Sequence, residues 1–266
     1  MVYNNKGILS LLTLIIFACT KTTSLEDNPL DPGGGDYEVP SVVIISDLQP
    51  GDAITSESIS IVLEGNDLVV EYRIRLDESE WTEWSNENSF TLDYLDEGNH
   101  TIYGQSRYLS SDESEIMSLD FIVDAVSGPA LMFHPRRHIS GLGENITFRI
   151  LAEEVYDLAG TEFVLDYDPA TVSIENVLSG DIFLALGDIF FFYEDKPSEG
   201  KLIITSAVWG SGEPSYTGTA VIAEVSIQIT QLGEIDMVFD GSELFRDPDN
   251  ESIQINTTIP GKIESY

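Results

Sequence analysis

The sequence has few basic residues and a single cysteine. Lysine and arginine together number 12, against 47 aspartates and glutamates, and the formal net charge of the 266 residues is −35. A surface of this sign repels nucleic-acid phosphates and anionic lipid headgroups, so neither is expected to be the main ligand. One cysteine excludes both an intrachain disulfide and a zinc site built from cysteines.

The sequence also lacks the short motifs of common catalytic sites. It contains no His-Glu-x-x-His motif, no Gly-x-Ser-x-Gly motif and no glycine-rich phosphate-binding loop. Its carboxylates are too numerous for a catalytic pair to be recognised by counting, and nothing distinguishes one pair from the rest. We therefore expect a protein that is not an enzyme and that has no catalytic metal or organic cofactor.

The apolar run near the N-terminus is too short to span a bilayer, which takes about 20 residues. It covers Ile8–Phe17 and follows Lys6, an arrangement typical of a secretory signal peptide. The run ends in Ile16-Phe17-Ala18-Cys19, which resembles the lipobox of bacterial lipoproteins. An ordinary signal peptide with an incidental cysteine is the alternative.

The lipobox resemblance implies a signal peptide over residues 1–18 and a lipid anchor on Cys19. Several acyl chains at one cysteine anchor a protein stably in a membrane, whereas a single chain is marginal. Thr20, in place of an aspartate, follows the cysteine. By analogy with the family, we expect an outer-membrane lipoprotein of the bacterial cell envelope, either periplasmic or surface-exposed.

Gly and Pro separate short apolar runs in the rest of the chain, which is typical of an all-β protein. Residues 19–39 are rich in Thr, Asp, Pro and Gly without apolar periodicity, so we expect a flexible tether. We predict two tandem β-sandwiches after it, at residues 40–126 and 127–266. Ser127-Gly128-Pro129 forms the expected junction, with few contacts across it.

The first predicted sandwich shows strands separated by turn signals. Ile59, Ile61 and Leu63 alternate with more polar positions and are expected to face a core. The expected strands are Val42–Ser46, Ser58–Glu64, Leu68–Leu76, Ser89–Leu95, Thr101–Tyr108 and Met117–Val123. Through Glu71–Asp77, Trp81–Ser85 and Leu95–Ile102 this unit resembles bacterial immunoglobulin-like or fibronectin-type modules, and we expect it to act as a spacer.

Trp81, Trp84 and His100 are the residues of this unit that need an interpretation. Trp81 and Trp84 either form a ligand platform or, as is more usual for such residues, pack over a sheet. His100 follows a turn at the start of a strand, where a hydrogen-bonded structural histidine is expected.

Two further motifs lie in the second unit. The basic cluster His134-Pro135-Arg136-Arg137-His138 either binds an anionic group or compensates charge in an acidic body. The segment Asp247-Pro248-Asp249-Asn250-Glu251 offers oxygen ligands suited to calcium, but its spacing matches no EF-hand. A solvated turn is therefore favoured there.

The second predicted sandwich has a more specific pattern. In Glu162–Tyr167, Phe163, Leu165 and Tyr167 alternate with a mixed face, and Asp168-Pro169 ends the strand. This unit resembles a cohesin domain, a nine-stranded jelly roll known as the dockerin receptor of cellulosome scaffolds. The resemblance rests on Gly143–Ile150, Asp157–Gly160, Phe163–Pro169, Ser179–Phe183, Gly200–Thr205 and Gly218–Ile229.

The cohesin resemblance implies a partner-binding sheet. It implies that Glu162, Val164 and Asp166 point toward a partner, which would be dockerin-like or another protein. The aromatic run Phe190–Tyr193 and Trp209 are candidates for the same face, with a position in the core as the alternative. From these aromatics we select Phe191, Tyr193 and Trp209 as partner-binding residues.

Three functions agree with the sequence. The first is a lipoprotein that captures a protein partner. The second is a polysaccharide-binding lipoprotein that uses exposed aromatics on the same fold, because several carbohydrate-binding modules share the cohesin fold. The third is a structural component of the envelope. A flat row of exposed aromatics would favour polysaccharide, and a broader mixed surface would favour protein.

Overall fold

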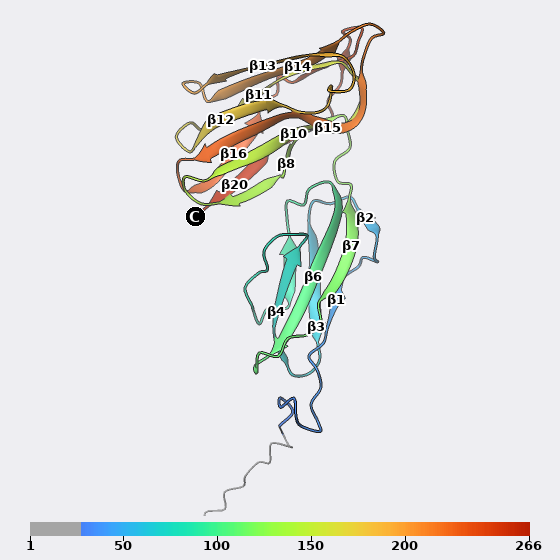
Figure 1. The fold of residues 1–266 in the computed structure, drawn as a ribbon, viewed down its shortest axis with the longest axis vertical. Helices are drawn as coiled ribbons and strands as arrows, with labels where there is room; N and C mark the ends of the chain where they lie inside the picture. Colours follow the sequence, from blue (N-terminus) through green and yellow to red (C-terminus); the bar gives the residue numbers. More distant parts are fainter. Residues whose placement is uncertain (1–27) are drawn as a thin grey trace, which may run out of the picture.

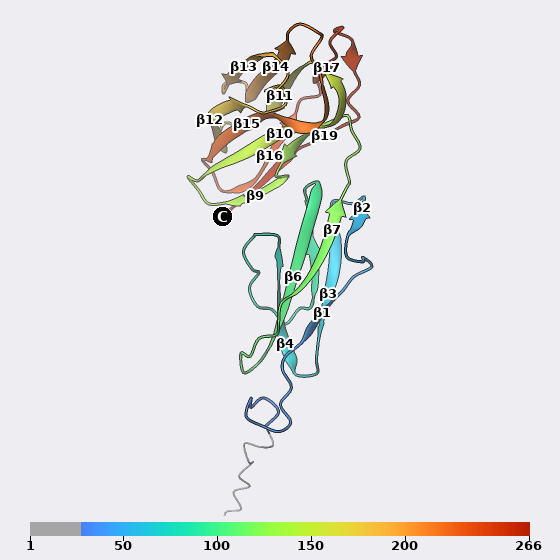
Figure 2. The same cartoon turned by 45° about the vertical axis from the view of Figure 1, so that its right-hand side comes forward.

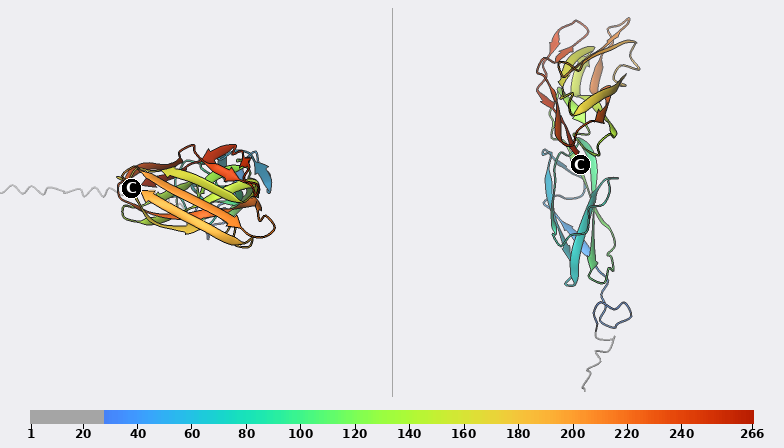
Figure 3. Two further views of the ribbon diagram at one scale, coloured as in Figure 1. Left: turned by 90° about the horizontal axis from the view of Figure 1, so that it is seen from above. Right: turned by 90° about the vertical axis from the view of Figure 1, so that its left-hand side faces the viewer.

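The computed structural model describes residues 28–266, and all regular secondary structure in this range is β-strand. Two bodies lie end to end along the long axis of the molecule (Figures 1 and 3). The predicted signal peptide and the predicted lipidation site Cys19 lie outside the described residues. Within residues 28–266 no helix is long and apolar enough to cross a membrane.

The first unit is a sandwich of a three-stranded sheet and a four-stranded sheet. The sheet orders are β1-β3-β5 and β2-β7-β6-β4. The strands are β1 (Val42–Ile45), β2 (Asp52–Ile54), β3 (Ile59–Gly65), β4 (Val69–Leu76), β5 (Ser89–Leu92), β6 (Gly98–Tyr108) and β7 (Met117–Val123). Every strand predicted for this unit is present, and β2, which was not predicted, adds to the edge of the four-stranded sheet by pairing with β7.

The core of the first unit follows from period-two alternation. Ile61 and Leu63 of β3 are buried, as predicted, against Ile102 and Phe121 of the other sheet. Apolar side chains at alternate positions leave water together when two sheets pack face to face.

The second unit is a larger sandwich. Its sheet orders are β12-β15-β10-β8-β19 and β13-β14-β11-β16-β20-β9, and β17 and β18 extend the second sheet from β11, to eight strands in all. The strands are β8 (Ala130–His134), β9 (Arg137–Ser140), β10 (Asn145–Leu158), β11 (Gly160–Asp166), β12 (Val172–Ser179), β13 (Asp188–Lys196), β14 (Lys201–Trp209), β15 (Tyr216–Ile229), β16 (Gly233–Phe239), β17 (Leu244–Arg246), β18 (Ser252–Ile253), β19 (Thr257–Ile259) and β20 (Gly261–Ser265).

One continuous core lies between these two sheets. Phe163 and Leu165 of β11 are fully buried in it, and Tyr167 is nearly so, which confirms the predicted inward face. Gly261 lies where a Cβ atom would come within 2.7 Å of the Phe133 ring. A glycine there lets β20 approach the core aromatics closely.

A buried arginine joins the two units. Arg136 lies in the turn between β8 and β9 and is only 2% exposed. Its Nη1 is 2.7 Å from Glu57 Oε2, and its Nη2 is 3.8 Å from Glu97 Oε1. Its backbone N–H donates to Asp96 Oδ1 at 2.7 Å. All three carboxylates belong to the first unit, so one side chain and its backbone connect the two sandwiches.

Tyr94 extends this interface. Its ring lies 5.3 Å from Lys262 Nζ of β20 and 5.8 Å from the Arg137 guanidinium of β9. Figure 2 shows β9 beside the end of the first unit. The sequence led us to expect few contacts across the junction, and no strand of one unit pairs with a strand of the other in residues 28–266. The contacts that do form are specific ones of charged side chains. Interface contacts come from residues far from the Gly-Pro junction in sequence, which local composition does not reveal.

The end of the expected tether also contacts the first unit. Tyr108 donates a hydrogen bond from its hydroxyl to the Glu38 carbonyl at 3.0 Å. The Tyr37 and Tyr108 rings pack edge to face with centroids 6.5 Å apart. Residues 37–38 therefore dock onto the sandwich although the composition of this segment indicated a flexible chain.

Candidate functional site

The outer face of the eight-stranded sheet is open where β13, β14 and β11 lie side by side. These strands are on the side of the second unit away from the first unit (Figure 1). Their pairing is antiparallel and regular, so outward side chains from the three strands form a continuous surface.

Outward residues of β11 are those that the sequence predicted. Glu162 is exposed and Val164 and Asp166 are half-buried, while the residues between them are buried in the core. Val164 is paired with Ile203 of β14, so two apolar side chains lie together near the middle of the face. The geometry places Glu162, Val164 and Asp166 on one surface, and their role in binding stays a prediction.

The aromatic run of β13 is divided between the two sides of the sheet. Phe190 is paired with Ala207 and Phe192 with Thr205, which puts both phenylalanines on the outer face. They are 43% and 50% exposed. Phe191 lies on the core side and packs against the core. Phe191 therefore does not lie on the surface for which the sequence analysis selected it.

Tyr193 shares the inward register of Phe191, so it too does not lie on the outer face for which it was selected. It is exposed nevertheless, because β13 is the edge strand of the sheet. Trp209 ends β14 on the outer face and is 61% exposed. Its ring centroid lies 6.5 Å from that of Phe190. Phe190, Phe192 and Trp209, with Val164 and Ile203, are called the apolar patch below.

Phe190 and Phe192 were not selected from the sequence. Four consecutive aromatics carry no alternation signal, so the strand itself does not indicate which pair faces out. The partner residues on β14 decide it, because the buried positions of β14 alternate clearly from Leu202 to Val208.

Carboxylates surround the apolar patch. Asp188 and Glu194 belong to β13, and Glu162 and Asp166 belong to β11. Asp166 is paired with Lys201, whose Nζ lies 2.8 Å from Asp166 Oδ1 and 3.0 Å from Asp240 Oδ2. Hydrogen bonds to these two carboxylates raise the pKa of Lys201 above its usual value.

A partly buried hydrogen bond links two strands beneath this face. The Tyr167 hydroxyl donates to Asp195 Oδ1 at 2.6 Å, which links the end of β11 to β13. Burial, together with this hydrogen bond to a carboxylate, raises the pKa of Tyr167 well above its usual range. Tyr167 therefore remains protonated and holds the edge strand in place.

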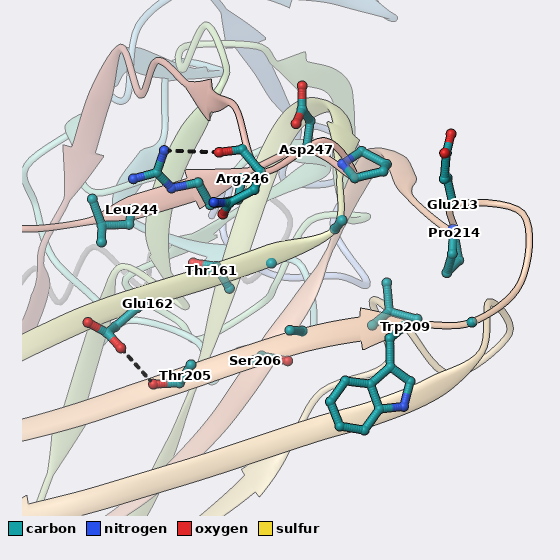
Figure 4. Close-up of a pocket in the computed structure, with 17 residues that line it drawn as sticks. Thr161, Glu162, Thr205, Ser206, Trp209, Glu213, Pro214, Leu244, Arg246 and Asp247 are labelled. Atoms are coloured by element: carbon teal, nitrogen blue, oxygen red, sulfur yellow. Dashed lines mark hydrogen bonds between the residues drawn. The ribbon is translucent and has the colours of Figure 1, made fainter.

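A pocket of about 470 Å³ opens at the end of this face (Figure 4). Gly160 of β11 and Ala207 of β14 are two small residues in its lining. Trp209 and Pro214 line one side, and Leu244, Arg246 and Asp247 line the other (Figure 4). The Glu162 carboxylate accepts a hydrogen bond from Thr205 at 3.1 Å at the edge of the pocket.

The tryptophans of the first unit have a different environment. The Arg73 guanidinium lies 4.8 Å from the Trp81 ring and 4.2 Å from the Trp84 ring. Arg107 covers Trp84 at 4.5 Å and Arg75 covers Trp81 at 5.2 Å. Both tryptophans are half-buried. They pack over the sheet with three arginines, which agrees with the packing interpretation.

His100 has the structural role that the sequence predicted. Its Nδ1 lies 2.7 Å from Asp77 Oδ2 and its Nε2 lies 2.8 Å from the Asp96 carbonyl oxygen. Both ring nitrogens therefore have partners, and the ring is almost fully buried.

The segment Asp247–Glu251 forms a turn between β17 and β18. Asp247 Oδ1 accepts the Glu251 N–H at 2.8 Å, and Asn250 has a φ of 65°. The Asp247 carboxylate is therefore already hydrogen-bonded to the backbone of the turn itself. Among residues 28–266, no group of three or more His, Cys, Asp or Glu side chains is arranged to hold a metal ion.

Residues 140–264 match the family model described as the cohesin domain. This match confirms the cohesin resemblance for the second unit. No curated protein matches the chain.

Solved structures similar to the chain include three cohesins. A non-cellulosomal cohesin from Archaeoglobus fulgidus is 17% identical, with 52% of this chain and 90% of that chain covered and a TM-score of 0.43. A type II cohesin from the cellulosome of Acetivibrio cellulolyticus is 15% identical, with 50% and 92% covered and a TM-score of 0.43. A type II cohesin from Bacteroides cellulosolvens is 14% identical, with 52% and 99% covered and a TM-score of 0.46.

Proposed function

We propose that the chain is a non-catalytic, lipid-anchored protein of the bacterial cell envelope whose second unit captures a protein partner. The partner, dockerin-like or another protein, binds the outer face of β13, β14 and β11. The match of residues 140–264 to the cohesin domain supports a protein-binding role. The first unit acts as a spacer between the anchor at Cys19 and this face.

The observation that carries the proposal is the open apolar patch. The core of a protein interface is more apolar than the rest of the surface and rich in aromatic side chains, and its rim is polar. Val164 and Ile203 occupy such a centre, and exposed Phe190 and Phe192 extend it. The surface is mixed and broad, which favours a protein over a polysaccharide.

Photo-crosslinking from defined positions tests this proposal. A photoreactive phenylalanine analogue placed at Phe192 or at Val164 in cells should form an adduct with the same protein. Thr147, an exposed position on the opposite sheet, is the matched control and should give no such adduct. Adding Val164→Arg to the Phe192 probe should remove the adduct, because a buried cation in an apolar contact is costly.

Two results would contradict protein capture on this face. Adducts of equal yield from Thr147 would show that the face is not selective. Retention of the chain on native cell-wall polysaccharide, lost on Trp209→Ala and unaffected by Val164→Arg, would identify the aromatics as a sugar-binding platform instead.

The anchor is tested separately. Metabolic labelling with a palmitate analogue should tag the wild-type chain, and Cys19→Ala should abolish the tag, because the labelled acyl chains would be carried by a diacylglyceryl group joined through a thioether to the Cys19 sulfur. Labelling that survives the substitution would remove the lipoprotein assignment without affecting the binding proposal.

A further inference from the structure

β13 is a long edge strand with an open side. It pairs with β14 over 9 residues without a register shift, and in residues 28–266 its other side belongs to no sheet. Within the same range, the turn bond that the Lys196 carbonyl accepts is the one backbone hydrogen bond that β13 makes outside its ladder with β14. Such an edge is a row of unpaired N–H and C=O groups, to which another chain can add a strand.

The other sheet edges of the molecule are short, irregular or covered. β1, β2, β5, β9, β18 and β19 have 4 residues or fewer. β12 has a register shift after Ile174. β4 has one after Val69, and its outer side pairs at Tyr72 with Ser85. Short strands, bulges and covering segments are the usual protections of a sheet edge, and β13 has none of the three.

The register of the sheet identifies the β13 groups that face the open side. In antiparallel sheets, the backbone N–H and C=O of alternate residues point to the same neighbouring strand. The Val208 N–H donates to the Ala159 carbonyl at 2.9 Å, so the even-numbered residues of β14 bond toward β11 and the odd-numbered ones bond toward β13. Asp188 lies opposite Trp209, so the even-numbered residues of β13 bond to β14. The residues whose backbone groups face the open side, called the edge-facing residues below, are Ile189, Phe191, Tyr193 and Asp195.

The side chains in the middle of β13 are apolar or aromatic on both faces of the sheet. Phe190 and Phe192 are exposed on the outer face, and Tyr193 is exposed in the inward register. Ile189 and Phe191, also in the inward register, are half-buried. A run of this kind on an open, regular edge promotes aggregation unless another chain covers it. The edge therefore fits an occupant that is itself extended and apolar in its middle.

Charge and geometry argue against a second copy of this chain as the occupant. The ends of β13 carry Asp188 on one side and Glu194, Asp195 and Lys196 on the other, in a chain of net charge −35. Two copies that pair through the same edge are related by a two-fold axis. Because β13 lies on the side of the second unit away from the first unit, that axis would turn the two first units to opposite ends (Figure 1). Two chains anchored in one membrane through Cys19 would not meet in this way.

We propose that the open edge of β13 accepts an extended segment of the captured protein as an added strand. The segment has apolar residues in its middle, beside Ile189–Tyr193, and lysine or arginine at its ends, beside the acidic ends of β13. Main-chain hydrogen bonds to the edge-facing residues hold it, and its side chains continue the apolar patch across the new strand. The inference rests on the proposed function for the source of the segment.

The test uses a synthetic strand in place of the partner. The probe is N-acetyl-Lys-Lys-Val-Ile-Tyr-Ile-Val-Lys-Lys-amide, methylated at alternate backbone nitrogens so that only one of its edges can pair and it does not stack on itself. It is added to the ¹⁵N-labelled full chain carrying Cys19→Ala, and amide hydrogen exchange is followed by NMR. In the free chain, the amides of the edge-facing residues should exchange faster than those of the β13 residues bonded to β14. Saturating probe should slow the edge-facing amides by about tenfold or more and leave those of the bulged edge strand β12 unchanged.

Matched probes separate backbone pairing from side-chain contact. A probe methylated at every backbone nitrogen keeps the side chains and the charge but has no main-chain donor, and it should bind about tenfold more weakly or worse. A probe with glutamate in place of the four lysines should also bind more weakly than the basic probe. That second difference should shrink as salt is added, because salt screens the contacts between exposed charges.

A pair of variants tests the edge from the side of the protein. Tyr193→Pro removes an edge-facing N–H without removing a bond to β14, at a kind of position where strands accept proline. It should weaken binding of the basic probe by about tenfold, because the central donor is lost. Tyr193→Val loses the same ring but keeps the N–H, and it should bind within about threefold of wild type. If Tyr193→Pro lowers the melting temperature, the comparison of the two methylated probes on the wild-type chain still decides the inference.

Three results would overturn the inference. They are equal binding of the fully methylated probe, edge-facing amides whose exchange the basic probe leaves unchanged, and a dimer of the free chain in sedimentation that Tyr193→Pro dissociates. The last result would assign the edge to a second copy. The titration contains no partner protein, so it can fail while photo-crosslinking from Phe192 and Val164 succeeds. In that case protein capture on the outer face stands and the added strand does not.

Discussion

The two units use outward aromatic residues in opposite ways. In the first unit, Trp81 and Trp84 are covered by arginines that are themselves paired, Arg73 with Glu113 at 3.3 Å and Arg107 with Glu71 at 2.6 Å. In the second unit, Phe190, Phe192 and Trp209 stay exposed on a sheet of similar construction. An aromatic on a sheet face is therefore not by itself a sign of binding.

The two faces differ in whether basic side chains of the protein itself lie over their aromatic residues. The first unit concentrates Arg73, Arg75 and Arg107 on one sheet of a chain that has only 12 basic residues. These arginine side chains cover Trp81 and Trp84, so the tryptophan rings already have partners within the molecule. The second face has carboxylates around its aromatics, and a basic partner is the natural complement of such a surface. This contrast leads to predictions that differ between the units.

The largest expected effect is on partner capture. Val164→Arg should abolish capture, because it places a charge at the centre of the apolar patch. The melting temperature should change little, since Val164 is only half-buried. Ile122→Arg, an exposed apolar position on the outer face of the first unit, is the control and should capture normally. Pulldown with thermal denaturation measures both properties, and loss of capture in the control would remove the distinction between the faces.

The next largest effect is expected on the stability of the interface between the two units, which depends on Arg136. Arg136→Ala should cost the interface about 3 kcal/mol, because it leaves Glu97 largely buried without its cation. Proteolysis at the Ser127–Pro129 junction should then become much faster than in the wild-type chain. Arg149→Ala, which removes an exposed arginine of β10, should leave the cleavage rate unchanged. Equal cleavage of wild type and Arg136→Ala would show that the interface is not formed in solution.

The two kinds of tryptophan should differ in their contribution to stability. Trp84→Ala should lower the free energy of unfolding of the first unit by about 2 kcal/mol, from lost packing and lost contacts with Arg73 and Arg107. Trp209→Ala should change stability by less than about 0.5 kcal/mol, since surface substitutions away from packed features have small effects. Urea denaturation of both variants measures this, and equal losses would contradict the contrast between closed and open faces.

A smaller effect is expected from the charged rim. Glu162→Lys should slow association with a basic partner several-fold and reduce its salt dependence, with little change in the dissociation rate. Glu175→Lys makes the same change on β12 of the opposite sheet and should behave as wild type. Stopped-flow or surface-binding kinetics at two salt concentrations separate the two rates, and a change confined to dissociation would place Glu162 inside the contact.

The smallest effect concerns pH. Burial lowers the pKa of His138 below its ordinary value of 6.5. The unfolded chain then binds this proton more readily than the folded chain does, so its contribution to stability is present above pH 6.5 and is lost as pH falls from 6.5 through the folded pKa. His138→Gln should flatten the dependence of unfolding free energy on pH in this window. An unchanged slope would assign the dependence to other groups.

The sequence by itself determined the fold class, most strands and the resemblance of the second unit to a cohesin domain, which a family model matches over residues 140–264. Alternation in Ile59–Leu63 and in Phe163–Tyr167 decides which side of each strand is buried, because strand side chains have a period of two. The outward position of Glu162, Val164 and Asp166 follows from the same rule.

Tertiary structure alone decided the features that depend on pairing between distant residues. The register of β13 on β14 exposes Phe190 and Phe192 and turns Phe191 to the core. In the sequence, Arg136 is one of several basic residues in a short segment. Only the structure shows that Glu57 and Glu97 of the first unit lie next to its guanidinium. The pocket at Trp209 needs β11, β14 and the turn after β17 together. Local patterns record the period of a strand, and they carry no information on which strand lies beside it.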